Sequence, residues 1–174
     1  LDILLPKSNK EVEMKIMLHF FSTIDVPFIS EGTVAKFFDN NYTKIRQVYY
    51  ATVDDFLTFE GVQEKTAQKI YNSVHSILDN KIDLAKLMHA SMSFGFGLGT
   101  KRFQIVLNSY PDYKKVSLGQ LEELEGFSSK ISKIFLDGLD DFGYFMAENK
   151  YLKYTIGKNV VPEMTVTSPL YFNR

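Results

Sequence analysis

Residues 96–102 of the chain read FGLGTKR, and this short stretch decides how the rest of the sequence is interpreted. Two glycines flank a single apolar residue and two cations follow directly, in a chain whose other apolar residues recur with helical spacing. Glycine destabilises a helix by about 1 kcal/mol relative to alanine, and cations in a first helical turn oppose the helix dipole. Because such local violations often mark functional positions, we expect a turn with a binding role that opens a helix.

The same kind of turn occurs four times. An apolar residue stands between small or flexible positions, and a helical pattern follows, at residues 28–30 (turn 1, FIS), 61–63 (turn 2, GVQ), 97–99 (turn 3, GLG) and 126–128 (turn 4, GFS). We expect the apolar residue to fill the gap between two helices, as in the hairpin of a helix-hairpin-helix motif. The neighbouring backbone amides then point outward at a helix N-terminus, where they suit a phosphate. Turn 1 has lost both glycines, and we expect Phe28 to pack rather than to cradle a phosphate.

Helical periodicity over the remaining segments predicts an all-α fold, with Ser30 and Thr52 as helix N-caps. The order of turn, helix, polar corner, short helix, glycine turn and long helix occurs twice, at a spacing of about 65–69 residues, which indicates an internal duplication. The predicted organisation is a lead-in over residues 1–9, a first helix-hairpin-helix pair over 10–79, a second pair over 80–154, and a linker or the start of a following domain over 155–174.

The composition narrows the possible functions. The 15 Phe and 10 Tyr residues and the 45% hydrophobic content predict a globular chain with a filled core. The absence of cysteine excludes disulfides, thiolate zinc sites and cysteine nucleophiles. At a net charge of −1, affinity for nucleic acid must come from local patches. No apolar run approaches the ~20 residues of a membrane span and no signal peptide is evident, so we expect an intracellular protein, in the cytoplasm or wherever DNA resides. Because the chain begins with Leu1, we expect it to be a piece of a longer protein.

Cations and hydroxyl side chains gather just after each turn. Cations are unfavourable at helix starts, and their presence there is explained if an anion lies between them and the turn amides. Backbone amides, hydroxyls and Lys or Arg form the usual set of phosphate contacts, and nothing in it reads base edges, so we expect sequence-independent binding of duplex DNA. The predicted DNA-binding residues are Ser30, Thr33, Lys36, Val62, Gln63, Lys65, Thr66, Lys69, Leu98, Gly99, Thr100, Lys101, Arg102, Phe127, Ser128, Ser129, Lys130 and Lys133.

Three segments resemble the helix-hairpin-helix domain of NAD-dependent DNA ligases, in the branch found in viruses and phages. They are residues 19–38 (HFFSTIDVPFISEGTVAKFF), residues 54–78 (DDFLTFEGVQEKTAQKIYNSVHSIL) and, above all, residues 87–112 (LMHASMSFGFGLGTKRFQIVLNSYPD). The resemblance covers about residues 15–146 and is most specific in the third segment. It implies a domain that holds nicked double-stranded DNA through minor-groove backbone contacts and helps a ligase to encircle it during replication or repair.

The resemblance also implies partners outside the chain. These are the adenylation and OB domains of the ligase, in cis or as a separate subunit, and a BRCT domain that could begin at residues 167–174 (TSPLYFNR). NAD would serve the parent ligase, whereas this fragment itself needs no cofactor. The Lys-x-Asp-Gly motif of the adenylation site is missing, because Phe135 stands two residues before Asp137-Gly138. We therefore predict no catalytic and no metal-binding residue, and expect that the chain does not seal nicks by itself.

Two other functions stay open. Residues 61–67 (GVQEKTA) resemble the hairpin of bifunctional DNA glycosylases, which would make Lys65 an amine nucleophile and Asp83 its carboxylate partner. Gln63, however, stands where that hairpin has a second glycine. The chain could instead be a helical protein-interaction module that uses Tyr42, Tyr49 and Tyr50, although tyrosines at such corners are commonly half-buried packing residues.

Overall fold

The computed structural model describes the backbone of residues 5–157 and the side chains of residues 9–157. This part of the chain is mostly helical, as an all-α fold requires. The first helix begins at Leu5, so most of the expected lead-in over residues 1–9 is helical instead. Pro6 is compatible with this start, because the first helical turn does not use its N–H groups in intrahelical bonds. Of the predicted linker or BRCT start over residues 155–174, residues 158–174 lie outside the described residues, and Thr155 is the last residue of a short strand.

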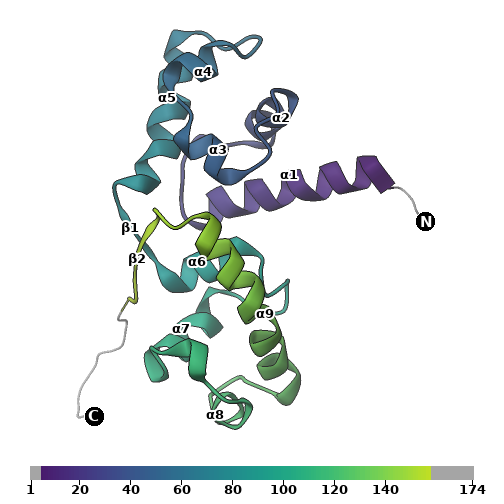
Figure 1. The fold of residues 1–174 in the computed structure, drawn as a ribbon, viewed down its shortest axis with the longest axis vertical. Helices are drawn as coiled ribbons and strands as arrows, with labels where there is room; N and C mark the ends of the chain where they lie inside the picture. The colour runs from purple at the N-terminus through teal and green to yellow at the C-terminus, as the bar shows by residue number, and fades with distance from the viewer. Residues whose placement is uncertain (1–4, 158–174) are drawn as a thin grey trace.

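The first half of the chain forms one lobe at one end of the molecule (Figure 1). Its elements are α1 (Leu5–Thr23), α2 (Glu31–Asp39), α3 (Ile45–Tyr50), α4 (Val53–Leu57), α5 (Glu64–His75) and the 3₁₀ turn η1 (Ser76–Leu78). Ser30 and Thr52 cap α2 and α4 by accepting hydrogen bonds from the amides of Thr33 and Asp55, which confirms both predicted N-caps.

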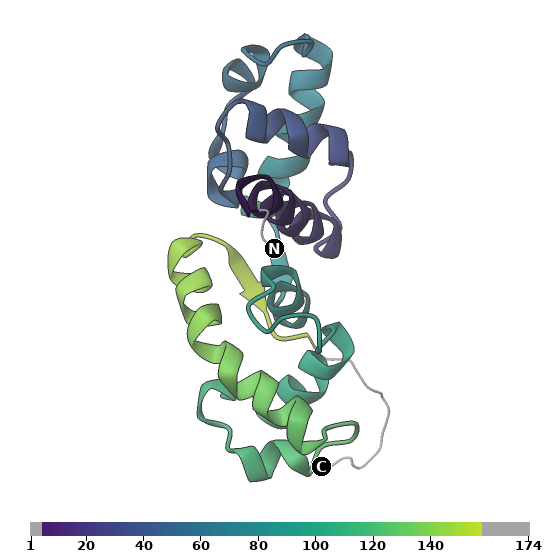
Figure 2. The same cartoon turned by 90° about the vertical axis from the view of Figure 1, so that its right-hand side faces the viewer.

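The second half forms the other lobe, and the two lobes follow one another along the long axis of the molecule (Figure 2). Its elements are α6 (Leu84–Ser91), α7 (Thr100–Ser109), the 3₁₀ turn η2 (Tyr113–Lys115), α8 (Leu118–Glu122) and α9 (Ser129–Glu148). Two three-residue strands, β1 (Lys81–Asp83) and β2 (Lys153–Thr155), pair in parallel with Ile82 opposite Tyr154. This pairing was not predicted, since three-residue strands are too short to show a period of two.

A single hydrophobic core runs through both lobes and is rich in phenylalanine. Helix α1 packs against α2 in its own lobe and against α6 in the other, so the predicted boundary at residues 79–80 is not a gap in the core. A buried hydrogen bond of 2.7 Å from the Tyr49 hydroxyl to Asn149 Oδ1 also joins the lobes. Burial of this hydroxyl raises the pKa of Tyr49.

Candidate nucleic-acid interface

All four turns share the same pattern of buried and exposed residues. Their apolar middle residues, Ile29, Val62, Leu98 and Phe127, are buried in the core, which confirms that they fill the gaps between helices. The residue before each of them is exposed. The residue after each of them is the N-cap of the following helix and has an extended backbone conformation in all four turns. The backbone therefore opens α2, α5, α7 and α9 in the same way.

The turns differ in where the chain adopts a left-handed conformation. Phe28, Gly61 and Gly126 occupy the same position in turns 1, 2 and 4, with φ of 66°, 79° and 82°. Ahead of turn 3 the left-handed residue is Gly95 instead, with φ of 74°. Gly97 has little room for a side chain: a Cβ atom on it would lie 3.1 Å from Cδ1 of Ile134 on α9, which would have to shift by a few tenths of an ångström.

Phe28 does not pack into the protein, so the expectation for this residue was wrong. Its side chain is 62% exposed, and the ammonium of Lys69 lies 4.6 Å from the centroid of its ring. A cation over an aromatic face is attracted by the ring quadrupole. This contact holds the Lys69 charge next to turn 1, although Lys69 belongs to the helix that follows turn 2. A groove along this face is lined by turn 1 and by α5 residues that include Lys65 and Lys69.

The turn amides are not equally available. In turns 1 and 4 the serine N-cap accepts a hydrogen bond from an amide of the first helical turn: Thr33 donates to Ser30 and Ile131 donates to Ser128. Gln63 makes no such side-chain bond, so the amides at the start of α5 are left open to an outside acceptor. Gly99 has no side chain with which to cap α7, and the same holds there.

The backbone amides of two predicted DNA-binding residues are not available to a phosphate. The Val62 amide donates to the Phe59 carbonyl at 3.1 Å, and the Phe127 amide donates to the Leu124 carbonyl at 3.1 Å. Both amides close their own turns and are not outward donors. Val62 and Phe127 therefore contribute through their buried side chains, which hold the turns in place.

Three cations lie next to a turn other than the one that precedes their own helix. Lys69, on the helix after turn 2, reaches turn 1, and Lys36, on the helix after turn 1, reaches turn 2, where its Nζ lies 3.9 Å from the position of a Cβ atom on Gly61. In the second lobe, Arg102 Nε donates to the Gly126 carbonyl of turn 4 at 3.1 Å. In the first lobe, the two helices thus exchange positive side chains between their turns, whereas in the second lobe a cation of α7 reaches turn 4. These contacts could not be predicted from the sequence, because spacing along the chain assigns each cation to its nearest turn.

The remaining predicted residues lie at the helix starts. Lys65 and Thr66 are exposed on α5, Lys101 is exposed on α7 beside the half-buried Thr100, and the exposed residues at the start of α9 are Ser128, Ser129, Lys130 and Lys133. The Ser30 and Thr33 hydroxyls are 3.1 Å apart. Among the ion pairs described for residues 9–157, none involves a lysine of these turns, so their charges are not neutralised within that part of the chain.

Acidic residues distinguish the two lobes. Glu31 and Glu64 occupy the first helical position after turns 1 and 2, beside the amides at the starts of α2 and α5. Helices α7 and α9 have no acidic residue in their first turns. A carboxylate at this position competes with an incoming phosphate for the same positive end of the helix. The helix starts of the second lobe are therefore electrostatically more favourable for an anion than those of the first, a difference that the sequence contains but that spacing alone does not single out.

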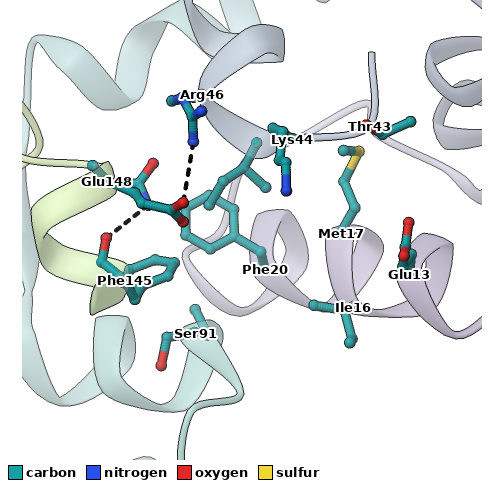
Figure 3. A pocket seen from close by; sticks show the side chains of 13 residues that line it. Glu13, Ile16, Met17, Phe20, Thr43, Lys44, Arg46, Ser91, Phe145 and Glu148 are labelled. Carbon is teal, nitrogen blue, oxygen red and sulfur yellow. Dashed lines mark hydrogen bonds and ion pairs between the residues drawn. The ribbon is translucent and has the colours of Figure 1, made fainter. Parts of the chain in front are cut away.

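A pocket at the junction of the lobes contains none of the predicted residues (Figure 3). It is lined mainly by α1, α3 and the end of α9, and Arg46 and Glu148 form an ion pair of 3.6 Å across it. Because this ion pair joins α3 to α9, the pocket is a partly filled seam between the lobes.

The geometry weakens both alternative functions. Lys65 lies at the start of α5 and Asp83 beyond its far end, and a helix of 12 residues is about 18 Å long, so the two side chains do not share a site. Asp83 instead caps α6 through the Ala85 amide. Of the three tyrosines, Tyr49 is buried, Tyr42 is half-buried and only Tyr50 is largely exposed, so these three residues offer little aromatic surface to a partner.

The described residues contain neither a metal-binding cluster nor a membrane-spanning helix. No group of three or more His, Asp or Glu side chains in residues 9–157 could hold a metal ion. Among the helices that the structure describes, none is long and apolar enough to cross a membrane.

Comparison with known proteins points to one class of relatives. The chain is 35% identical over 145 residues to a protein named DNA ligase from Acanthamoeba polyphaga mimivirus, a match that covers 79% of the chain and 23% of the relative. It is 30% identical over 125 residues to putative DNA ligase 205R of Invertebrate iridescent virus 6, covering 70% of the chain and 20% of that protein. No family model and no solved structure matches. The chain is thus related to viral proteins named DNA ligase and spans less than a quarter of the length of these two relatives.

Proposed function

We propose that the chain is a non-catalytic, sequence-independent duplex-DNA-binding domain of an NAD-dependent DNA ligase. It consists of two tandem helix-hairpin-helix pairs, one in each lobe, that arose by duplication. Its turns contact the phosphate backbone and hold nicked DNA for the catalytic domains, which lie elsewhere in the parent protein. NAD acts in those domains and not in this chain.

One observation carries the proposal: four helices open with the same extended N-cap beside exposed cations. A helix N-terminus carries a partial positive charge and free N–H groups, and both favour a phosphate. The exchange of Lys36 and Lys69 places a charge next to each of turns 1 and 2. The relationship to proteins named DNA ligase supplies the reason to choose DNA among phosphate-bearing ligands.

The sites are unequal. Turn 3 combines uncapped amides with Lys101 and with no acidic residue in the first turn of its helix, so it is the strongest phosphate site. Turn 4 follows, with Lys130 and Lys133 exposed beside a serine that already occupies one amide. Turns 1 and 2 are weaker because Glu31 and Glu64 oppose an anion.

The test is a binding titration with a nicked duplex and its dependence on salt. For four to six phosphate contacts, log affinity should fall with log salt at a slope of about −3.6 to −5.4, and Kd at physiological salt should be on the order of micromolar or weaker. Changing Lys101 and Lys130 together to glutamate should weaken binding and reduce the magnitude of the slope by about 2. Arg102 is left intact because it holds turn 4 through the Gly126 carbonyl.

The matched control makes the same change in net charge away from the turns. Lys81 and Lys114 are both exposed, lie in β1 and η2, and belong to no turn, so their joint change to glutamate should weaken binding much less. Equal losses in the two double variants would mean that net charge alone governs binding. Binding that does not respond to salt would exclude the phosphate contacts altogether.

A further inference from the structure

Two phenylalanines project from the odd-numbered turns into solvent. Phe96, immediately before turn 3, is 92% exposed, the largest value among the exposed large hydrophobic residues in the described part of the chain. Phe28, in turn 1, is 62% exposed. Turns 2 and 4 have glycine at the position of Phe28 and present no phenylalanine to solvent. Each lobe therefore combines one turn that exposes a phenyl ring with one that does not.

The backbone conformation is unfavourable for the side chain of Phe28, whereas next to Phe96 the bend falls on a glycine. Phe28 adopts φ of 66°, a left-handed conformation that a bulky side chain disfavours and that glycine adopts freely in turns 2 and 4. Phe96 stands between Gly95 and Gly97, and Gly95 is itself left-handed at φ of 74°, so the chain bends on the N-terminal side of the exposed ring. Neither ring is buried in the core, so packing does not account for these two choices.

We propose that Phe28 and Phe96 are apolar wedges that enter the minor groove of duplex DNA and favour a duplex whose strand is interrupted. This inference rests on the proposed function and identifies which feature of the DNA the turns select. Each ring lies within four residues of open or lysine-flanked helix-start amides, so a phosphate bound there brings the ring to the adjoining sugar and groove edge.

The chemistry around the rings fits a groove better than a protein surface. A protein interface has a contiguous apolar patch at its centre, whereas each ring here is a single apolar group beside cations: Lys69 over Phe28, and Lys101 shortly after Phe96. The minor groove of duplex DNA, which is narrow and has apolar sugar faces between anionic phosphates, matches that combination. Apolar side chains inserted between base steps partly unstack them and kink the duplex. An interrupted strand resists such deformation less, which gives selectivity without base contacts.

The experiment compares two duplexes of identical sequence, one with a single central nick and one uninterrupted, by fluorescence anisotropy. The variants are Phe96→Ala, Phe28→Gly and, as control, Tyr144→Ala, which removes a 73% exposed aromatic ring from α9 away from the turns. Phe28→Gly relieves the left-handed strain, so its thermal midpoint should not fall and any lost affinity is not a loss of folding. A 2-aminopurine beside the nick reports unstacking directly.

Phe96→Ala should weaken binding to the nicked duplex about tenfold, the scale of one aromatic–base stack, and binding to the uninterrupted duplex about threefold or less. Phe28→Gly should act in the same direction, and both should leave the salt slope unchanged because no charge is removed. The wild-type chain should raise 2-aminopurine fluorescence, and the Phe28→Gly/Phe96→Ala double variant should not. Tyr144→Ala should match the wild type throughout.

Other outcomes separate the two proposals. If the wild-type chain binds both duplexes and the phenylalanine variants keep its affinities and its fluorescence response, the wedge is refuted and the phosphate contacts stand. Equal losses on the two duplexes also refute it, since a plain surface contact does not distinguish them. If the wild-type chain binds neither duplex at any salt concentration, the proposed function fails, and the wedge fails with it.

Discussion

Gly138 provides a sharp test of the core, because Gly138→Ala should destabilise a helix that alanine would normally strengthen. In the middle of α9, replacing glycine by alanine normally stabilises by about 1 kcal/mol. A Cβ atom at this position would lie 2.4 Å from Cδ2 of Phe94 and 3.0 Å from its Cα. Because a backbone atom is among the obstacles, turning the Phe94 ring alone does not make room.

The size of the effect follows from the surroundings of Phe94. Its ring packs against Phe103, Phe135 and Phe142, with centroids 4.8, 5.3 and 5.6 Å away, so a shift of Phe94 disturbs the whole aromatic cluster. Overpacking of a filled core costs about 1–3 kcal/mol, and a blocked backbone places this site toward the upper end. After the gain in helix propensity, the net loss in the free energy of unfolding should be about 1–2 kcal/mol.

The matched control lies on the same helix. Gly143 is exposed and nothing lies within 4 Å of a Cβ atom added to it, so Gly143→Ala should stabilise by about 0.5–1 kcal/mol. Urea unfolding followed by circular dichroism gives both numbers, provided that the m-values of the variants agree. A Gly138→Ala variant as stable as the wild type would show that α9 and Phe94 are not in close contact, and the packing described here would be wrong.

Two further predictions concern a turn and a half-buried histidine. Gln63→Ser should cap the open Thr66 amide and so raise the free energy of unfolding by about 0.5–1 kcal/mol. It should also lower DNA affinity, because the new hydroxyl competes with phosphate for that amide. A gain in both stability and affinity would contradict this competition. Burial, and then the neighbouring His19, lower the pKa of His89, with a backbone hydrogen bond to Leu98 opposing them. Its neutral form therefore stabilises the fold above the unfolded pKa of about 6.5, and that stability is lost as pH falls through the lower folded pKa. The urea midpoint should decrease from pH 7 to pH 5, and less so in His89→Leu; identical pH profiles would exclude His89 as the cause.

Local sequence signals predicted the helices and the turns well. The period of apolar residues located the helices, and the alternation of apolar and small residues identified the middle residues of the turns as buried, as found for Leu98 and Phe127. Ser30 and Thr52 were recognisable as caps because capping depends on residues three positions apart. All of these features are set by neighbours in the sequence.

The features that were missed depend on residues far apart. The pairing of β1 with β2 joins positions about 70 residues apart, and Lys36 and Lys69 each lie next to the turn that precedes the other helix. Gly97 was interpreted as a flexible turn residue, and its close approach to Ile134 of α9 was not foreseen. Asp137-Gly138 was set aside as a weak echo of an adenylation motif, and the contact with Phe94 gives the glycine a purely structural reason.

The exchanged cations determine the smallest part of this fold that can be transferred to another protein with its turns complete. A single helix–turn–helix cut from the first lobe and grafted into another scaffold would keep its amides but lose the lysine that serves them, because Lys36 and Lys69 come from opposite members of the pair. A gene segment that encodes only one member of the pair would yield a turn without its neighbouring lysine. A segment that encodes both members would transfer the turns together with their lysines. Recombination or design with this chain should therefore proceed in whole lobes.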